Sequence, residues 1–131
     1  MFSLTACSST PTTFTNNITK TVTDTANFPY GGIIAVSLVV ETAQDSKGDT
    51  YMELNKASYS IQKFDDPESI DKIEFTYFDG YGEHSFSSDD LSGEYTVDVK
   101  KVPALNNNLH ARAIVYMTNG ETFEHDCSFT G

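Results

Sequence analysis

The chain has 131 residues and a net charge of −11 at pH 7, from 8 basic and 19 acidic residues. This length suits one domain that buries a hydrophobic core without help from disulfide bonds or metal ions, and the negative charge excludes nucleic acid as an expected partner, because binding to phosphates requires a cationic surface. No apolar run approaches the roughly 20 residues of a membrane-spanning helix, so no transmembrane segment is predicted.

The first 16 residues are rich in serine and threonine and are expected to form a polar N-terminal arm, with residues 17–131 as a single domain. Leu4-Thr5-Ala6-Cys7, followed by two serines, resembles the lipobox of bacterial lipoproteins, in which the cysteine is lipidated and a polar tether follows. The resemblance implies an exported, lipid-tethered module. An export signal also contains a basic segment and an apolar stretch of roughly 7 to 15 residues, so this interpretation requires residues upstream of Met1.

Two segments after the arm have the pattern of β-strands. In Asn17 to Asp24, Ile18 and Val22 fall on one face and three threonines on the other, which predicts an edge strand or an arm strand with one solvent-exposed side. Gly32 to Glu41 is a continuous, β-branched apolar run and is predicted to be the most buried and central strand. A polar turn cluster between Ala43 and Thr50 then reverses the chain.

The next segment, from Thr50 to Phe64, changes phase. Its apolar residues occupy even positions as far as Leu54 and odd positions from Tyr59. Because side chains alternate with a period of two along a strand, the change requires an inserted residue. A β-bulge or a break is therefore predicted between Asn55 and Ala57.

Two shorter patterns occupy the middle of the chain. Asp66 to Ser69, with a proline at its second position, is typical of a short helical turn that is capped by the aspartate. Glu94 to Val102 alternates apolar and polar residues and is predicted to be one strand, which Pro103 ends.

Asp79-Gly80 and Asn119-Gly120 predict two β-hairpins, because glycine readily adopts the positive φ that a tight turn requires. Around the first dipeptide, loops of two or four residues preserve the same faces, so the loop length stays open. Around the second, a three-residue connection with Gly120 as a left-handed bulge pairs Val115 with Phe123. That register gathers the apolar residues of both strands on one face.

The predicted fold is all-β. At least six predicted strands are apolar on one face and polar on the other, so they require two sheets that cover each other's apolar faces. We therefore expect an antiparallel β-sandwich of immunoglobulin-like type with about eight strands. A small β-barrel is the alternative. The cysteine and tryptophan arrangement of true immunoglobulin domains is missing, since the sequence contains no tryptophan.

No catalytic constellation is recognisable in the sequence. His84, His110 and His125 lie in separate predicted strands without the spacing of a zinc site, and they are interpreted as structural. Strand alternation also places His125 and Cys127 on the core face, whereas a catalytic cysteine requires an exposed, electropositive setting. The protein is therefore predicted not to be an enzyme.

The two cysteines, Cys7 and Cys127, are disulfide candidates. In an oxidising compartment a bridge between them would fasten the arm to the last strand and add roughly 4 to 5 kcal/mol in the chain-entropy model. In a reducing compartment both would be free thiols, and lipidation of Cys7 would exclude the bridge.

Acidic residues gather in two loops that the first predicted hairpin brings to the same end of the domain. The six carboxylates belong to Asp65, Asp66, Glu68, Asp71, Asp89 and Asp90. Carboxylate oxygens are the ligands that calcium prefers, so these residues form a candidate calcium site. The alternative is a solvated acidic rim, and no other cofactor is expected.

Three functional hypotheses follow. The preferred one is a non-enzymatic structural and interaction module, a subunit of a larger assembly such as a virion or a surface appendage, whose N-terminal arm docks on copies of itself or on other subunits. The second is a lipoprotein-type binding module, with calcium as a candidate ligand. The third is a hydrolase that uses the acidic end. The first two favour a virion or an extracytoplasmic surface over the cytoplasm.

Overall fold

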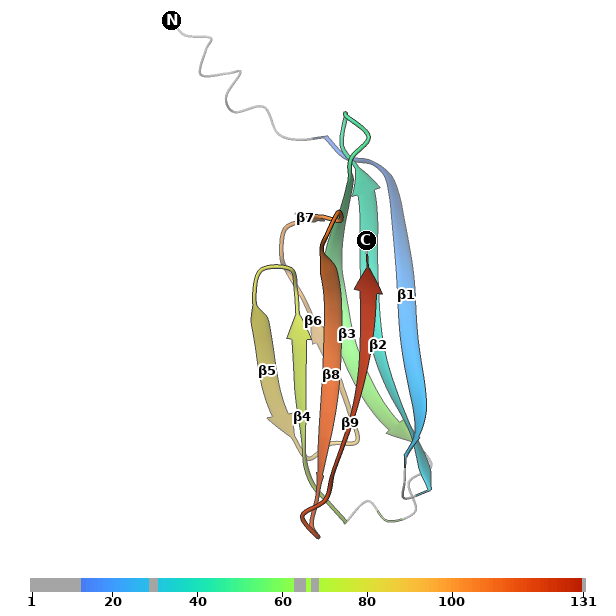
Figure 1. Cartoon of the computed structure of the whole chain (residues 1–131), viewed down its shortest axis with the longest axis vertical. Helices are drawn as coiled ribbons and strands as arrows, with labels where there is room; N and C mark the ends of the chain where they lie inside the picture. The colour runs from blue at the N-terminus through green and yellow to red at the C-terminus, as the bar shows by residue number, and fades with distance from the viewer. Residues whose placement is uncertain (1–12, 29–30, 63–65, 67–68, 131) are drawn as a thin grey trace, which may run out of the picture.

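The computed structural model describes residues 13–28, 31–62, 66 and 69–130, which form nine strands in two antiparallel sheets (Figure 1). The strands run along the long axis of the molecule in two layers. Their bounds are β1 (Thr15–Phe28), β2 (Gly32–Gln44), β3 (Thr50–Gln62), β4 (Ile70–Phe78), β5 (Glu83–Ser88), β6 (Ser92–Thr96), β7 (Val102–Pro103), β8 (Asn108–Met117) and β9 (Thr122–Thr130).

The two sheets remain separate at their edges. The first sheet has the order β1-β2-β3-β6, with β7 also paired to β3, and the second has the order β5-β4-β8-β9. Because each sheet keeps two edge strands, the barrel alternative is wrong, and the arrangement is consistent with a β-sandwich. β1 includes residues 15 and 16, which the sequence pattern placed in the arm.

The core lies between the sheets and is built from alternate residues of the inner strands. In β2 the side chains of Ile34, Val36, Leu38 and Val40 are fully buried, and each such burial contributes about 1.5 to 3 kcal/mol to stability. β2 lies between β1 and β3, which confirms its predicted central position. β1 lies at the edge of its sheet, also as predicted.

The phase change in β3 is a β-bulge. Val39 pairs with Lys56 and Val40 pairs with Leu54, so Asn55 is the extra residue. Leu54 before the bulge and Ala57 after it are both fully buried. The insertion therefore keeps both halves of the strand directed at the core, which confirms the prediction.

The last hairpin has the predicted register. Val115 lies opposite Phe123, and Arg112 lies opposite Asp126. Gly120 has a φ of 93°, and its N–H donates to the Met117 carbonyl over 3.0 Å. The three-residue connection with a left-handed glycine is thus confirmed.

The first hairpin has the longer of the two candidate loops. Phe78 pairs with Glu83, so the loop contains the four residues 79–82. The carboxylate of Asp79 accepts hydrogen bonds from the backbone N–H groups of Tyr81 and Gly82 over 2.7 and 2.9 Å. This side-chain capping of the turn favours four residues over two.

The predicted continuous strand from Glu94 to Val102 is wrong. β6 ends at Thr96, and pairing with β3 resumes only at β7. The Val97 N–H donates to the carbonyl of the bulged Asn55 over 2.9 Å, and the kink that a bulge puts into a strand prevents a straight neighbour from following it. Of the predicted helical turn at 66–69, residues 67 and 68 lie outside the described residues.

Candidate functional site

At one end of the sandwich, which we call the arm end, β1 begins beside the β2–β3 turn and β7 (Figure 1). The pairing of β1 with β2 is irregular between Thr15 and Ile18, and Asn16 has a left-handed φ of 58°, a conformation that asparagine tolerates better than most residues. The Asn16 side-chain amide donates to Gln44 Oε1 over 2.7 Å, and that of Asn17 donates to Glu41 Oε2 over 3.0 Å. These bonds fix where the chain enters β1.

A charged group stands beside this entry on the outer face of the first sheet. Glu41 and Glu53 lie directly opposite each other on β2 and β3, an arrangement that is repulsive by itself. Lys101 resolves the repulsion, because its Nζ lies 3.3 Å from Glu41 Oε2 and 3.6 Å from Glu53 Oε1. The lysine side chain is only 17% exposed and the two glutamates 23%, so solvent screens these attractions less than at an open surface.

Phe14 completes the group, which we call the arm-root cluster. Its ring lies edge-on to Tyr51 at a centroid distance of 5.2 Å, and the Lys101 Nζ lies 5.3 Å from its ring centre. Edge-to-face aromatic pairs contribute about 0.5 to 1.5 kcal/mol, and a lysine over an aromatic ring adds a cation–π attraction. The members of the arm-root cluster are Phe14, Asn17, Glu41, Tyr51, Glu53 and Lys101.

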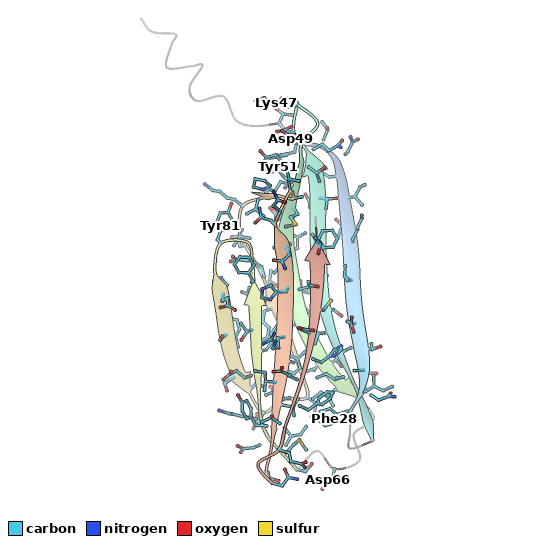
Figure 2. All side chains as sticks on the ribbon, viewed as in Figure 1. Phe28, Lys47, Asp49, Tyr51, Asp66 and Tyr81 are labelled. Carbon is cyan, nitrogen blue, oxygen red and sulfur yellow. The ribbon has the colours of Figure 1, made fainter. Side chains whose placement is uncertain are left out.

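An open groove adjoins the arm-root cluster, and Tyr51 belongs to both. The groove has a volume of about 480 Å³ and is lined by Gly48, Asp49, Thr50, Tyr51, Pro103, Ala104 and Leu105. Its walls are held in place, because the Ala104 N–H donates to the Thr50 carbonyl over 2.9 Å and the Asn107 side chain donates to the Pro103 carbonyl over 2.7 Å. We call it the Leu105 groove; Figure 2 labels Asp49 and Tyr51 at this end.

Exposed apolar side chains concentrate at the arm end. Of the four large hydrophobic residues that are exposed in the described part of the chain, Leu105 is 79% exposed, Tyr81 62% and Ile18 51%, whereas Phe86 on β5 is 37% exposed. Ile18 lines a second groove, of about 470 Å³, that meets the Leu105 groove at Thr50. Exposed apolar surface that gathers in one region indicates a binding surface.

The β4–β5 loop connects to this surface through Asp79 and Tyr81. Asp79 is buried, and its Oδ2 lies 2.7 Å from His84 Nε2. Burial by itself raises the pKa of the Asp79 carboxyl, but the N–H groups of Tyr81 and Gly82 and the nearby His84 lower it more, so the pKa lies below its ordinary value. The Tyr81 hydroxyl in turn donates to the Lys101 carbonyl over 3.1 Å.

β9, in the second sheet, contacts β1, in the first sheet, through two of its side chains. His125 Nε2 lies 2.9 Å from Asp24 Oδ1, within the distance of an ion pair when the imidazole is protonated, and it makes no hydrogen bond to any of the described residues. The Cys127 thiol donates to the Val22 carbonyl over 3.6 Å. Burial, followed by the charge of Asp24, raises the pKa of this thiol, and a protonated thiol is a poor nucleophile. His125 and Cys127 therefore have structural surroundings rather than those of a catalytic pair.

The other two histidines also contact structural partners. His84 holds Asp79, as described above, and His110 stacks on Phe78 with a centroid distance of 5.4 Å. Sequence reasoning missed both Asp24 and Asp79 as partners. The capping role of Asp79 could have been found, because the aspartate opens the sequence Asp79-Gly80-Tyr81-Gly82, and an aspartate at the start of a turn typically accepts bonds from the backbone N–H groups that follow it. The pairing of Asp24 with a residue about a hundred positions away leaves no local signal.

The predicted calcium ligands are solvent-exposed wherever the structure describes them. These are Asp66, Asp71, Asp89 and Asp90, while Asp65 and Glu68 lie outside the described residues. Within the described ranges, no three His, Cys, Asp or Glu side chains are grouped closely enough to hold a metal ion. The six-carboxylate site therefore stays a prediction. The disulfide bond between Cys7 and Cys127 also stays a prediction, because Cys7 lies outside the described residues and only Cys127 is placed.

Comparison with known proteins adds no relative: no protein-family model, curated protein or solved structure matches this chain. Among the residues that the structure describes, no helix is long and apolar enough to cross a membrane.

Proposed function

We propose that the protein is a non-enzymatic interaction module, an immunoglobulin-like β-sandwich that serves as a subunit of a larger assembly and docks through its N-terminal arm. The observation that carries this proposal is the anchoring of the arm at Phe14, between Tyr51 and Lys101. The chain passes between the two sheets after β3, β5 and β7, as it does in sandwiches with Greek-key connections.

The anchoring matters because docking has an entropic cost. A segment whose base is already fixed loses less conformational freedom when it binds than one that is free along its whole length. The bonds of Asn16 and Asn17 and the packing of Phe14 fix that base on the outer face of the first sheet. They also place it next to the grooves and to the exposed Ile18 and Leu105.

The chemistry of the described side chains supports a binding role over a catalytic one. The thiol of Cys127 is buried and has a raised pKa, while Asp79 is occupied by two backbone N–H groups and His84. A general base or a nucleophile must be able to reach a substrate, and these groups instead hold the fold together.

A chain lacking residues 1–12 tests the proposal against the full chain. We expect the full chain to bind its assembly, or to self-associate in analytical ultracentrifugation, and the truncated chain to remain monomeric and unbound. Phe14→Ala should weaken binding in the full chain, whereas the exposed variant Thr118→Ala, at the other end, should not. Unchanged binding after the truncation would refute the docking role of the arm.

A second candidate is the exported lipoprotein-type module, in which Cys7 would carry the lipid. The same anchored arm root favours it, because a tether that starts at a fixed base holds the sandwich at a defined end relative to a membrane. Mass spectrometry of the protein from its native source distinguishes the two. A lipid on Cys7 would support the tether, and an unmodified Cys7 within an intact N-terminal segment would support the docking arm.

A further inference from the structure

We propose that the Leu105 groove receives the N-terminal arm of a second copy of this chain, so that two copies exchange residues 1–12. This inference rests on the proposed docking function of the arm and adds to it the identity of the partner and the position of the receiving surface.

The groove has the character of an acceptor for an apolar segment. Its lining includes Tyr51, Pro103, Ala104 and Leu105, and Leu105 is the most exposed large hydrophobic residue in the described part of the chain. The hydrogen bonds between Ala104 and Thr50 and between Asn107 and Pro103 hold its two walls in place. A preformed apolar groove gives up little conformational freedom when a ligand occupies it.

The arm is polar overall, but it is uncharged and carries apolar side chains that this groove accepts. Every Lys, Arg, Asp and Glu of the chain lies at residue 20 or beyond, so the arm carries no charged side chain, while the rest of the chain carries the net charge of −11. An acidic segment would be repelled by an acidic body, and the arm would not. Phe2 and Leu4 are two positions apart and share one side when the segment is extended, which suits them to an apolar groove.

The position of the arm root favours exchange between two copies. Tyr51 contacts Phe14 and also lines the groove, so the arm of each copy starts at the rim of that copy's own groove. When two arm ends face each other, each root therefore lies close to the opposite groove. Twelve residues reach at most about 40 Å when extended, and a two-fold pair forms the same contact twice.

Complementation between two defective chains tests this assignment. The first chain lacks residues 1–12 and keeps its groove, while the second keeps its arm and carries Leu105→Asp, which puts an unpaired charge into the groove. We expect the wild type to be a dimer in analytical ultracentrifugation and the truncated chain to be a monomer. Dimerisation of L105D should weaken about tenfold or more. A mixture of the two variants should form a one-to-one complex, since one intact arm then meets one intact groove.

The alternative outcomes distinguish failure of the groove assignment from failure of the proposed function. If the truncated chain dimerises like the wild type, the arm has no docking role and both proposals fail. If the wild type dimerises through its arm but the two variants do not complement each other, the arm binds elsewhere and only the groove assignment fails. If the wild type is monomeric and a synthetic peptide of residues 1–12 binds the truncated chain but not the full chain, each arm fills its own groove, and exchange is refuted.

Two controls separate loss of the groove from loss of the fold. Thr118→Asp adds the same charge at an exposed position of the β8–β9 turn, at the opposite end of the sandwich, and should leave dimerisation unchanged. Because Leu105 is 79% exposed, Leu105→Asp introduced into the truncated, monomeric chain should keep the unfolding midpoint of that chain. A lower midpoint would contradict the groove assignment, unless Leu105→Ser weakens dimerisation of the full chain without lowering the midpoint of the truncated one.

Discussion

The two ends of the sandwich use acidic residues in different ways. At the arm end, Asp79 is buried and Glu41 and Glu53 are half-buried, and each has a close partner. At the other end Asp66, Asp89 and Asp90 are exposed. The sequence drew attention to the second group because of its number of carboxylates, whereas the structure draws attention to the first. Pairing and burial, rather than local charge density, distinguish the carboxylates of the arm end from those of the other end.

The largest effect is expected at Asp79. Asp79→Ala removes the acceptor of two backbone N–H groups and of His84, and unsatisfied buried donors are costly. We expect a loss of about 2 to 4 kcal/mol of unfolding free energy in urea titrations. The matched change Asp89→Ala, at the exposed end, should cost about 0.5 kcal/mol or less. Equal losses for the two variants would refute the distinction between the ends.

The same carboxylate should make stability depend on pH in the acidic range. Its pKa in the folded protein lies below the ordinary value of 3.8, so its contribution is complete above that value and is lost as the pH falls through the lower, folded-state pKa. The stability of the wild type minus that of Asp79→Asn should therefore shrink between pH 6 and pH 2 in denaturant titrations. A difference that stays constant over this range would contradict the assignment.

A smaller effect is expected at Lys101. Lys101→Met leaves Glu41 and Glu53 facing each other without their cation, which should cost about 1 to 2 kcal/mol, reduced from the value of a fully buried pair because these side chains keep some exposure. Adding Glu53→Gln should restore most of the loss. The exposed pair of Lys56 and Glu94 provides the control, and Lys56→Met should cost about 0.5 kcal/mol or less.

Phe14→Ala should have a still smaller effect on stability, but it should make the start of β1 much more accessible to proteases. Loss of the ring contact with Tyr51 should cost about 0.5 to 1.5 kcal/mol. Because the ring fastens the start of β1, limited proteolysis should cut the variant faster between residues 13 and 18 than the wild type. Cleavage at wild-type speed would show that Phe14 does not anchor the arm.

The smallest effect is expected at the exposed acidic end. A double variant, Asp89→Asn with Asp90→Asn, should change the unfolding free energy by about 0.5 kcal/mol or less in chelator. Repeating the measurement in millimolar calcium tests the calcium hypothesis. A stabilisation by calcium that the double variant loses would show that this end binds cations.

The parts of the fold that were predicted correctly are those that depend on neighbours along the chain. The bulge at Asn55 follows from the period of two along a strand, because one inserted residue shifts that period. The register around Gly120 follows from the same period, because a left-handed glycine in the connection brings the apolar residues of β8 and β9 to one face. The break between β6 and β7 was missed although its cause, the bulge, was predicted. Its effect falls on a neighbouring strand that lies about forty residues away in the sequence.

Alternation of apolar and polar residues therefore determined by itself that this chain forms antiparallel strands with one solvent-exposed face, and where two of its turns lie. Only the tertiary structure decided that Lys101 meets Glu41 and Glu53, that Asp24 meets His125, and that Phe14 packs on Tyr51. The physical reason is that alternation selects the face of a strand on which a side chain lies. Which residue it meets depends on how the strands are ordered and how the sheets are stacked, and no local pattern in the chain encodes those choices.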